Sequence, residues 1–377
     1  MKALILSGGG ARGAYQVGVL QAVAELATKH KLRSPFKIYT GISAGAINAA
    51  FMGCGADDFS LTVSRLSKMW SEIESSHVFK TDALSLGKIG LQWMGELSFG
   101  GVKNKTNPQR ALLDTAPLHE LLRQNLEFSK IQPNIENKSL SAVAVTALDY
   151  RTSTAITFVQ GAQNSPMWER TRRRSELAQL KAEHIMSSSA IPLLFPPVQL
   201  DERWFGDGCI RNQTPCSPAL HLGAEKLFVI GVRKQSETAD DLKAKNQKLS
   251  PSVARVVNVL LNSVMLDGVE VDIERLKRVN DFVDRVPENM QDKLNFKKVD
   301  YVWIHPTQDI GAIAAGMATR LPRVIRYLLK GLGPLEDASE IISYLLFEPD
   351  FCKKLIELGY QDGMAQQSAI ENFLLTD

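Results

Sequence analysis

The stretch IYTGISAGAINA, residues 38–49, constrains the fold of this chain more than any other segment. A run typical of a buried strand enters it, and an apolar run with helical spacing leaves it. At the junction, Ser43 stands in the pattern G-x-S-x-G, with Gly41, Ala44 and Gly45 as small neighbours. Between a strand and a helix this pattern predicts a nucleophile elbow, a tight turn that holds a serine hydroxyl clear of the sheet. A serine that only caps the helix is the other interpretation.

A glycine-rich turn follows the first expected strand. The apolar run at 2–7 predicts a buried strand, SGGGARG occupies 7–13, and apolar positions at helical spacing continue over 12–29. A second strand is expected at 36–40, directly before the elbow. Two successive strand–helix units predict a parallel α/β sheet with helices on its faces. Further strands are expected at 140–148, 154–159, 226–232 and 300–306.

Three interpretations are open for the glycine turn. Consecutive glycines let backbone N–H groups converge on one point, and a helix start adds partial positive charge, so the turn can stabilise an oxyanion. Gly8, Gly10 and Gly13 also match G-x-G-x-x-G, the dinucleotide-binding fingerprint. That fingerprint expects an acidic residue at the end of the second strand, where this chain has the serine elbow and no Asp or Glu. The third interpretation is a turn with a structural role alone.

Together these motifs resemble those of the patatin-like phospholipase family. GGGARG followed by GISAG is similar to the family's G-G-G-x-R/K-G loop and G-x-S-x-G serine, and FGDGC at 205–209 is similar to its D-G-G/A aspartate motif. Cys209 departs from that motif, which has Gly or Ala at this position, but it is still a compact residue. SSSAIPLLFPPV at 187–198 is similar to a segment that precedes the family's aspartate strand. The resemblance extends over roughly residues 1–232.

The resemblance implies a lipid acyl hydrolase, of phospholipase A or lysophospholipase type, with a Ser–Asp dyad. Ser43 would attack the acyl ester, and Asp207 would be the general base for forming and hydrolysing the acyl-enzyme. Arg12 would brace the glycine loop or approach a phosphate, and a solvated arginine at the helix start is the alternative. The implied site also includes the oxyanion-hole residues Gly8, Gly9, Gly10, Ala11, Arg12 and Gly13, the elbow residues Gly41, Ile42, Ala44 and Gly45, and Gly208 of the acid motif.

The alternatives are a different hydrolase and a protein without hydrolase activity. A general carboxylesterase or thioesterase would use a Ser–Asp–His triad in the chain order Ser43, Asp207, His305. That fold places several strands before the elbow, whereas only one precedes the elbow's own strand here. The other five histidines occupy no triad-like context. Outside the hydrolases, the alternatives are a dinucleotide-binding protein and a non-catalytic lipid-binding protein.

The resemblance also implies a three-layer α/β/α fold with a mostly parallel central sheet and a C-terminal helical extension. Residues 1–310 are the expected catalytic domain, and residues 311–377 are the extension. Residues 77–110 interrupt the strand–helix alternation and are interpreted either as a mobile lid or as an insertion with a small core of its own. The C-terminal helices are expected to pack on the sheet edge, shape the pocket or mediate self-association as an oligomer.

Composition limits which partners and cofactors the chain is expected to bind. With 44 basic and 41 acidic residues the net charge is +3, which gives no indication of a nucleic-acid partner. The four cysteines form no C-x-x-C pair, so we expect reduced thiols, a cytoplasmic location, no metal and no cofactor. No apolar run approaches the roughly 20 residues of a membrane span. The opening MKALILSGGG resembles a strand and is not expected to be a signal peptide.

The expected partner is a phospholipid or another acyl lipid. Peripheral contact with a membrane surface is predicted from Lys88, Lys103 and Lys105 with Trp93, and from the basic cluster RTRRR at 170–174. A solvated surface is the other interpretation of such a charge run.

Overall fold

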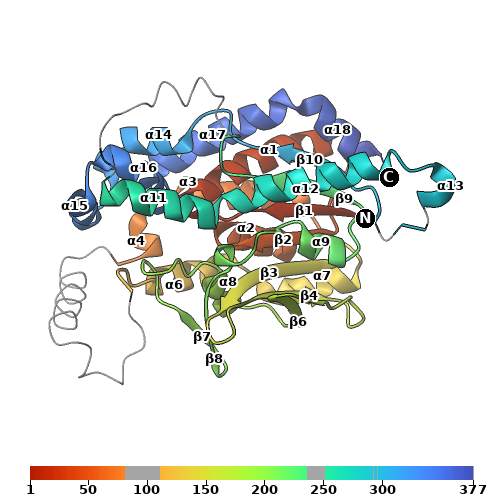
Figure 1. Ribbon diagram of the computed structural model, residues 1–377, viewed down its shortest axis with the longest axis horizontal. Helices are drawn as coiled ribbons and strands as arrows, with labels where there is room; N and C mark the ends of the chain where they lie inside the picture. The colour runs from red at the N-terminus through yellow and green to blue at the C-terminus, as the bar shows by residue number, and fades with distance from the viewer. Residues whose placement is uncertain (81–110, 236–249, 251, 292, 295, 377) are drawn as a thin grey trace.

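The structure is a computed structural model that describes residues 1–80, 111–235, 250, 252–291, 293–294 and 296–376 (Figure 1). The lid or insertion expected at 77–110 lies outside the described residues except for 77–80. The cations and the tryptophan of that segment, on which membrane contact was predicted, lie outside them too.

One mixed sheet forms the centre of the described residues. Its strands are β1 (Lys2–Leu6), β2 (Ile38–Ile42), β3 (Ala142–Asp149), β4 (Thr154–Gly161), β5 (Glu169–Arg170), β6 (Arg173–Leu177), β7 (Val198–Leu200), β8 (Arg203–Asp207), β9 (Lys226–Ile230) and β10 (Asp300–Ile304). The main order is β10-β9-β1-β2-β3-β4-β6-β5, and β8 pairs with both β7 and β3. β10, β9, β1, β2 and β3 run parallel to their neighbours in this order, whereas β4 is antiparallel to β3.

The central strands are apolar on both faces because helices cover both. Along β1, Leu4 and Leu6 belong to one hydrophobic core, and Ala3 and Ile5 belong to a second. Successive side chains of a strand point to opposite faces, so the two cores lie on opposite sides of the sheet. This gives a three-layer α/β/α arrangement with a mostly parallel sheet, as the sequence predicted.

The helices divide between these two layers and the ends of the sheet (Figure 1). The first core includes residues of α1 (Gly13–Lys29), α2 (Ala44–Cys54), α3 (Phe59–Ser71), α17 (Pro349–Ala365) and α18 (Gln367–Leu375). The second core is covered by α9 (Ser217–His221) and α12 (Asp267–Val283). The other helices are α4 (Ser75–Val78), α6 (Ala116–Asn125), α7 (Ile131–Glu136), α8 (Ala182–Ser188), α11 (Val253–Met265), α13 (Glu288–Gln291), α14 (Ile310–Gly316), α15 (Arg323–Leu332) and α16 (Ser339–Leu345). Within the described ranges, no helix is long and apolar enough to cross a membrane.

The first and the penultimate helices cross with almost no space between their backbones. A Cβ added to Gly18 of α1 would lie 1.9 Å from the carbonyl oxygen of Ile356 in α17. A Cβ added to Gly359 of α17 would lie 2.1 Å from the carbonyl oxygen of Tyr15 in α1. Each helix therefore needs a glycine where it meets the other.

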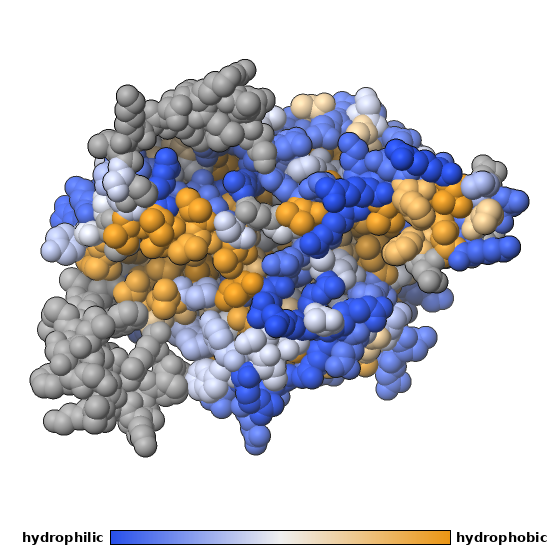
Figure 2. All heavy atoms as spheres, viewed as in Figure 1, coloured by the Kyte–Doolittle hydropathy of each residue, from blue (hydrophilic) through white to orange (hydrophobic). Residues whose placement is uncertain are grey.

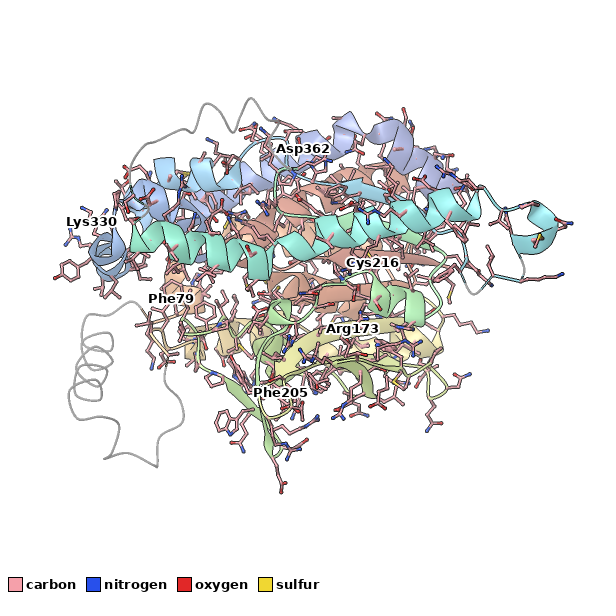
Figure 3. The ribbon with its side chains drawn as sticks, viewed as in Figure 1. Phe79, Arg173, Phe205, Cys216, Lys330 and Asp362 are labelled. Atoms are coloured by element: carbon pink, nitrogen blue, oxygen red, sulfur yellow. The ribbon has the colours of Figure 1, made fainter. Side chains whose placement is uncertain are left out.

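A buried carboxylate strengthens the same contact. Asp362 of α17, labelled in Figure 3, accepts hydrogen bonds from the Tyr15 hydroxyl at 2.9 Å and from the Thr307 hydroxyl at 2.7 Å. The end of the chain thus shares a core with its beginning. The domain boundary at residue 310 stays a prediction, and the two segments it separates are closely packed.

Candidate active site

Ser43 alone makes the turn between β2 and α2. Its backbone angles, φ 55° and ψ −128°, cost a residue with a side chain about 1–3 kcal/mol. A Cβ on Gly41 would lie 2.1 Å from the carbonyl oxygen of Gly45, and a Cβ on Gly45 would lie 2.1 Å from that of Leu6. Backbone contact therefore requires both glycines of the motif, and the local geometry is that of a nucleophile elbow.

The pairing of β3 places Asp207 next to Ser43. Ile42, the last residue of β2, pairs with Thr146 of β3, and Asp207, the last residue of β8, pairs with Ala147. β4 pairs with one edge of β3 along its whole length. β2 and β8 therefore pair with the opposite edge, one after the other along the strand. The last residue before the elbow and the aspartate of the acid motif therefore pair with consecutive residues of β3, which brings the two motifs together.

Asp207 is a fully buried carboxylate with one free oxygen. Its Oδ1 accepts the backbone N–H of Cys209 at 2.9 Å, whereas Oδ2 has no hydrogen-bond partner among the described residues. Burial raises the pKa of Asp207 to about 6, although interactions with the Ser43 hydroxyl and with Cys209 lower it in part. The Ser43 contact is thus close but not an aligned hydrogen bond, which is common for catalytic pairs that hold no substrate.

The glycine loop reaches Ser43 and Cys209, the latter two residues after Asp207. A Cβ on Gly8 would lie 2.4 Å from the Cys209 sulfur and 3.0 Å from the Ser43 Cβ. A Cβ on Gly208 would lie 2.1 Å from the carbonyl oxygen of Thr146. The loop, the elbow and the acid motif therefore converge, and their closest approaches require glycine.

The glycine loop opens a helical segment. Gly10, at φ 58°, opens the 3-10 turn η1 (Gly10–Arg12), which runs directly into α1. The first N–H groups of a helical segment have no carbonyl one turn earlier to bind, so those of Gly9, Gly10 and Ala11 are available to a ligand. Gly10 and Ser43 line the same cavity.

Helix α16 covers the other side of this loop. A Cβ on Gly10 would lie 2.3 Å from the carbonyl oxygen of Tyr344. The space on that side, which a dinucleotide pyrophosphate would need, is therefore filled by protein. The dinucleotide interpretation of the glycines finds no support in this geometry.

Contacts of the buried Arg12 side chain brace the glycine loop. Its side chain is only 2% exposed, its Nε donates to the Ser343 hydroxyl at 2.7 Å, and its guanidinium forms an ion pair with Glu340. The guanidinium also lies 5.3 Å from the centre of the Tyr344 ring. Of the roles considered for Arg12, bracing matches these contacts, and a solvated arginine does not.

A buried polar network that the sequence analysis missed joins the loop to the elbow helix. Asn48 of α2 donates to Gln16 at 2.9 Å and to the Gly13 carbonyl at 3.1 Å, and Gln16 donates to the Ser7 carbonyl at 2.7 Å. Trp70 donates its indole N–H to Asn48 at 2.7 Å. Polar residues on the apolar faces of two expected helices were the only signal for this network.

Ser188 is a second residue without a role in the sequence analysis. Its hydroxyl accepts the backbone N–H of Ser43 at 2.9 Å and donates to the carbonyl oxygen of Thr146 at 2.6 Å. It thereby ties the strained elbow to β3. The segment 187–198 was noted for its family resemblance, but its residues had no chemical assignment.

An apolar cavity opens beside Ser43. The space free of protein atoms there is about 420 Å³ with open solvent included, so the cavity itself is narrow. Its lining is apolar apart from two serines and the glycine of the loop. The lining residues are Gly10, Ser43, Ala44, Ile47, Met69, Trp70, Ile73, Val78, Leu118, Leu121, Ser189, Ile191, Phe195 and Phe347. Such a cavity suits an acyl chain better than a polar substrate.

His305 lies away from this site. It follows β10, which is three strands from β2 in the sheet order, a separation of roughly 14 Å at the usual strand spacing. Its ring contacts Trp303, with centroids 4.8 Å apart, and Nδ1 lies 3.4 Å from the Pro306 carbonyl oxygen. A triad that includes His305 does not match this placement.

The basic cluster at 170–174 also lies elsewhere, on β5 and β6. Arg173 donates to Thr214, and Arg174 forms an ion pair with Glu176 at 3.0 Å. At least two of its charges thus have partners within the protein.

The fold and the three converging motifs define a class: an α/β/α protein with an elbow-mounted serine beside a buried carboxylate. The chain belongs to the patatin-like phospholipase family, because the family model described as Patatin-like phospholipase matches residues 4–220. That range includes the glycine loop, the elbow and the acid motif. Membership confirms the resemblance seen in the sequence and supports a lipid hydrolase as the class of activity.

Several solved structures match this chain over most of its length at low sequence identity. Human GIVD cytosolic phospholipase A2 is 11% identical with a TM-score of 0.45, and the match covers 99% of this chain and 60% of that chain. VipD from Legionella pneumophila is 12% identical with a TM-score of 0.36, covering 98% and 67%. The type III effector ExoU, from Pseudomonas aeruginosa, is 14% identical with a TM-score of 0.37, covering 98% and 53%. This chain thus spans roughly half to two thirds of those chains, and no curated protein sequence matches it.

Proposed function

We propose that this protein hydrolyses carboxylic ester bonds of acyl lipids, as a phospholipase A or lysophospholipase, through a Ser43–Asp207 dyad. The observation that carries the proposal is the arrangement on β3, where Ile42, the residue before the elbow serine, and the buried carboxylate residue Asp207 pair with consecutive residues. The apolar cavity beside Ser43 supports an acyl chain as the bound group.

In the first step the Ser43 oxygen attacks the ester carbonyl while Asp207 accepts the hydroxyl proton. The carbonyl oxygen becomes an oxyanion, which the N–H groups of Gly9, Gly10 and Ala11 stabilise by hydrogen bonds. Collapse of this intermediate breaks the ester bond. The leaving alcohol takes the proton from Asp207, and the acyl group stays on Ser43.

In the second step water replaces the alcohol. Asp207, again ionised, takes a proton from the water, which attacks the acyl-enzyme carbonyl. The same N–H groups stabilise the second oxyanion. The proton then passes to Ser43 as the fatty acid leaves, which restores the starting state.

The pKa of Asp207 predicts how activity depends on pH. The base must be ionised to accept a proton, and burial raises its pKa to about 6. We therefore expect kcat/KM for a soluble short-chain ester to be low in acid and to rise through a midpoint at about pH 6. A profile that stays flat from acid to neutral pH would contradict this role for Asp207.

Covalent labelling tests the nucleophile directly. We expect an alkyl fluorophosphonate to lose fluoride to the Ser43 oxygen and to leave one phosphonyl adduct on the peptide that contains Ser43, identified by mass spectrometry. Ser43→Ala should take up no label, and the unfolded wild-type chain should not react. Labelling of the folded Ser43→Ala variant at the wild-type rate would refute the assignment.

A further inference from the structure

Helix α11 presents an apolar face outward. Two of its residues in successive turns, Val256 and Leu260, are 48% and 60% exposed. The exposed apolar residues of the whole helix are Val253, Val256, Val259, Leu260 and Val264. Its inward face includes a polar residue, Asn258, which accepts the backbone N–H of Glu340 at 3.1 Å. A helix on the surface of a globular protein normally has a polar outward face.

The apolar surface continues onto neighbouring segments. Tyr327 and Leu328 of α15 are 77% and 43% exposed, and Leu193, in the segment that follows α8, is 69% exposed. Figure 2 shows hydrophobic residues gathered over α11 and next to it on this side of the molecule. We call the five α11 residues together with Leu193, Tyr327 and Leu328 the apolar face. Contiguous exposed patches of this kind mark interaction sites.

A second cavity lies under the apolar face, with about 830 Å³ of space free of protein atoms when open solvent is included. Leu193 and Leu328 of the face line it, together with α11 and α16 side chains such as Leu261 and Leu345. It shares a wall with the Ser43 cavity: Ile191 and Phe195 line the Ser43 side, and residues 192–194 line this side. The apolar face therefore adjoins the candidate active site.

The two helices that carry most of the apolar face bear only positive charges. α11 and α15 together contain the cations Arg255, Arg323, Arg326 and Lys330 and no acidic residue. Figure 3 labels Lys330 at the α15 end of the molecule, well away from Arg173 of the other basic cluster. Apolar side chains beside cations are complementary to the interior and the headgroups of an anionic bilayer.

We propose that the apolar face docks on the surface of an anionic phospholipid bilayer and sets the Ser43 cavity beside the lipid. The proposal deepens the function proposed above and rests on it for the identity of the substrate. Val256, Val259 and Leu260 enter the acyl boundary, while the cations of α11 and α15 meet lipid phosphates. Tyr327 places an aromatic ring with a polar tip at the headgroup level, where such residues concentrate.

Vesicle flotation tests the docking surface. The 377-residue chain carrying Ser43→Ala, which leaves the lipid intact, is mixed with vesicles of phosphatidylcholine alone or of an equal mixture with phosphatidylglycerol. We expect binding to the anionic vesicles that weakens as salt is added. Adding V256D and L260D should weaken that binding about tenfold or more. Replacing Arg323, Arg326 and Lys330 with glutamine should remove the preference for anionic vesicles.

Leu61→Asp is the matched control. Leu61 is 58% exposed, close to the value for Leu260, but it lies by the end of α1 farthest from the glycine loop, where Ser60 contacts Thr28 at 2.9 Å. This variant should bind vesicles as its parent does. Equal loss in L61D, or unchanged binding in V256D/L260D, overturns the proposal.

Two further measurements distinguish bilayer docking from self-association and from a damaged fold. If the parent self-associates in sedimentation and V256D/L260D is monomeric and still floats, the face joins copies of this chain and the bilayer proposal fails. Fluorophosphonate labelling of V256D/L260D in a chain that retains Ser43 should proceed at the wild-type rate. If the wild type itself does not label, the proposed function fails, whereas the flotation result still decides the docking surface.

Discussion

Asp207→Asn is expected to lower kcat/KM for a soluble ester by about 10²–10⁴-fold. The amide can keep the hydrogen bond that Oδ1 accepts from Cys209, but it cannot take a proton from Ser43 or from water. Steady-state hydrolysis of a short-chain chromogenic ester measures the effect without any contribution from membrane binding. Because Asp207 lies in the core, the variant also needs a test of folding.

The folding test has an expected direction of its own. Burial raises the pKa of Asp207 from about 3.9 in the unfolded chain to about 6 in the folded protein. The folded state therefore holds the proton more tightly, and the free energy of unfolding falls as the pH rises between these values. Above pH 6 the ionised group costs about 3 kcal/mol, at 1.36 kcal/mol for each pKa unit. Asp207→Asn should consequently be more stable than the wild type in urea at neutral pH, and similar to it in acid.

His305→Ala is the control that distinguishes a dyad from a triad. Its ring lies on the far side of β9 and β1 from the elbow, so the variant should hydrolyse the same ester at close to the wild-type rate. Loss of activity as severe as in Asp207→Asn would show that the dyad assignment is wrong.

Gly18→Ala is expected to be the most damaging single methyl addition in α1. The new Cβ would lie 1.9 Å from the carbonyl oxygen of Ile356, an atom of the α17 backbone that no rotamer change can move. The two helices must separate, and overpacking of this kind costs about 3 kcal/mol. Urea unfolding should show a midpoint well below that of the wild type.

Gly316→Ala is the matched control for that substitution. Gly316 is the last residue of α14, and an added Cβ there would meet no atom within 4 Å. The change should be neutral or should stabilise the protein by up to about 1 kcal/mol, through helix propensity. If both variants lose the same stability, the close crossing of α1 and α17 is not the cause.

The family, the fold class and the order of the motifs could be predicted from the sequence because they depend on local patterns. G-x-S-x-G can be recognised because Gly41 must clear the carbonyl oxygen of Gly45 within the same strand–turn–helix unit, and Gly45 must clear that of Leu6 in the neighbouring strand. The first two strands can be recognised as short apolar runs, each followed by a turn that contains glycine. The catalytic roles of Ser43 and Asp207 stay predictions until activity is measured.

Features that depend on distant segments could not be predicted. No residue near Arg12 in the sequence indicates that its guanidinium will contact Ser343 and Glu340. The register by which β3 pairs with β2 and then with β8 is set by the packed sheet, and no single motif encodes it. For the same reason Ser188 and the Asn48–Gln16 hydrogen bond were missed, since each joins elements that only tertiary packing brings together.

Because helix α16 covers the glycine loop, the loop depends during synthesis on a segment that is made much later. About 300 residues separate Ser43 from Tyr344, and a ribosome adding about 5–20 residues per second needs about 15–60 s to traverse them. During that interval the growing chain already contains Ser43. It does not yet contain Ser343, which accepts a hydrogen bond from Arg12, or helix α16, which covers Gly10. The braced and covered form of the glycine loop can therefore assemble only after the segment that contains Ser343 and Tyr344 has been synthesised.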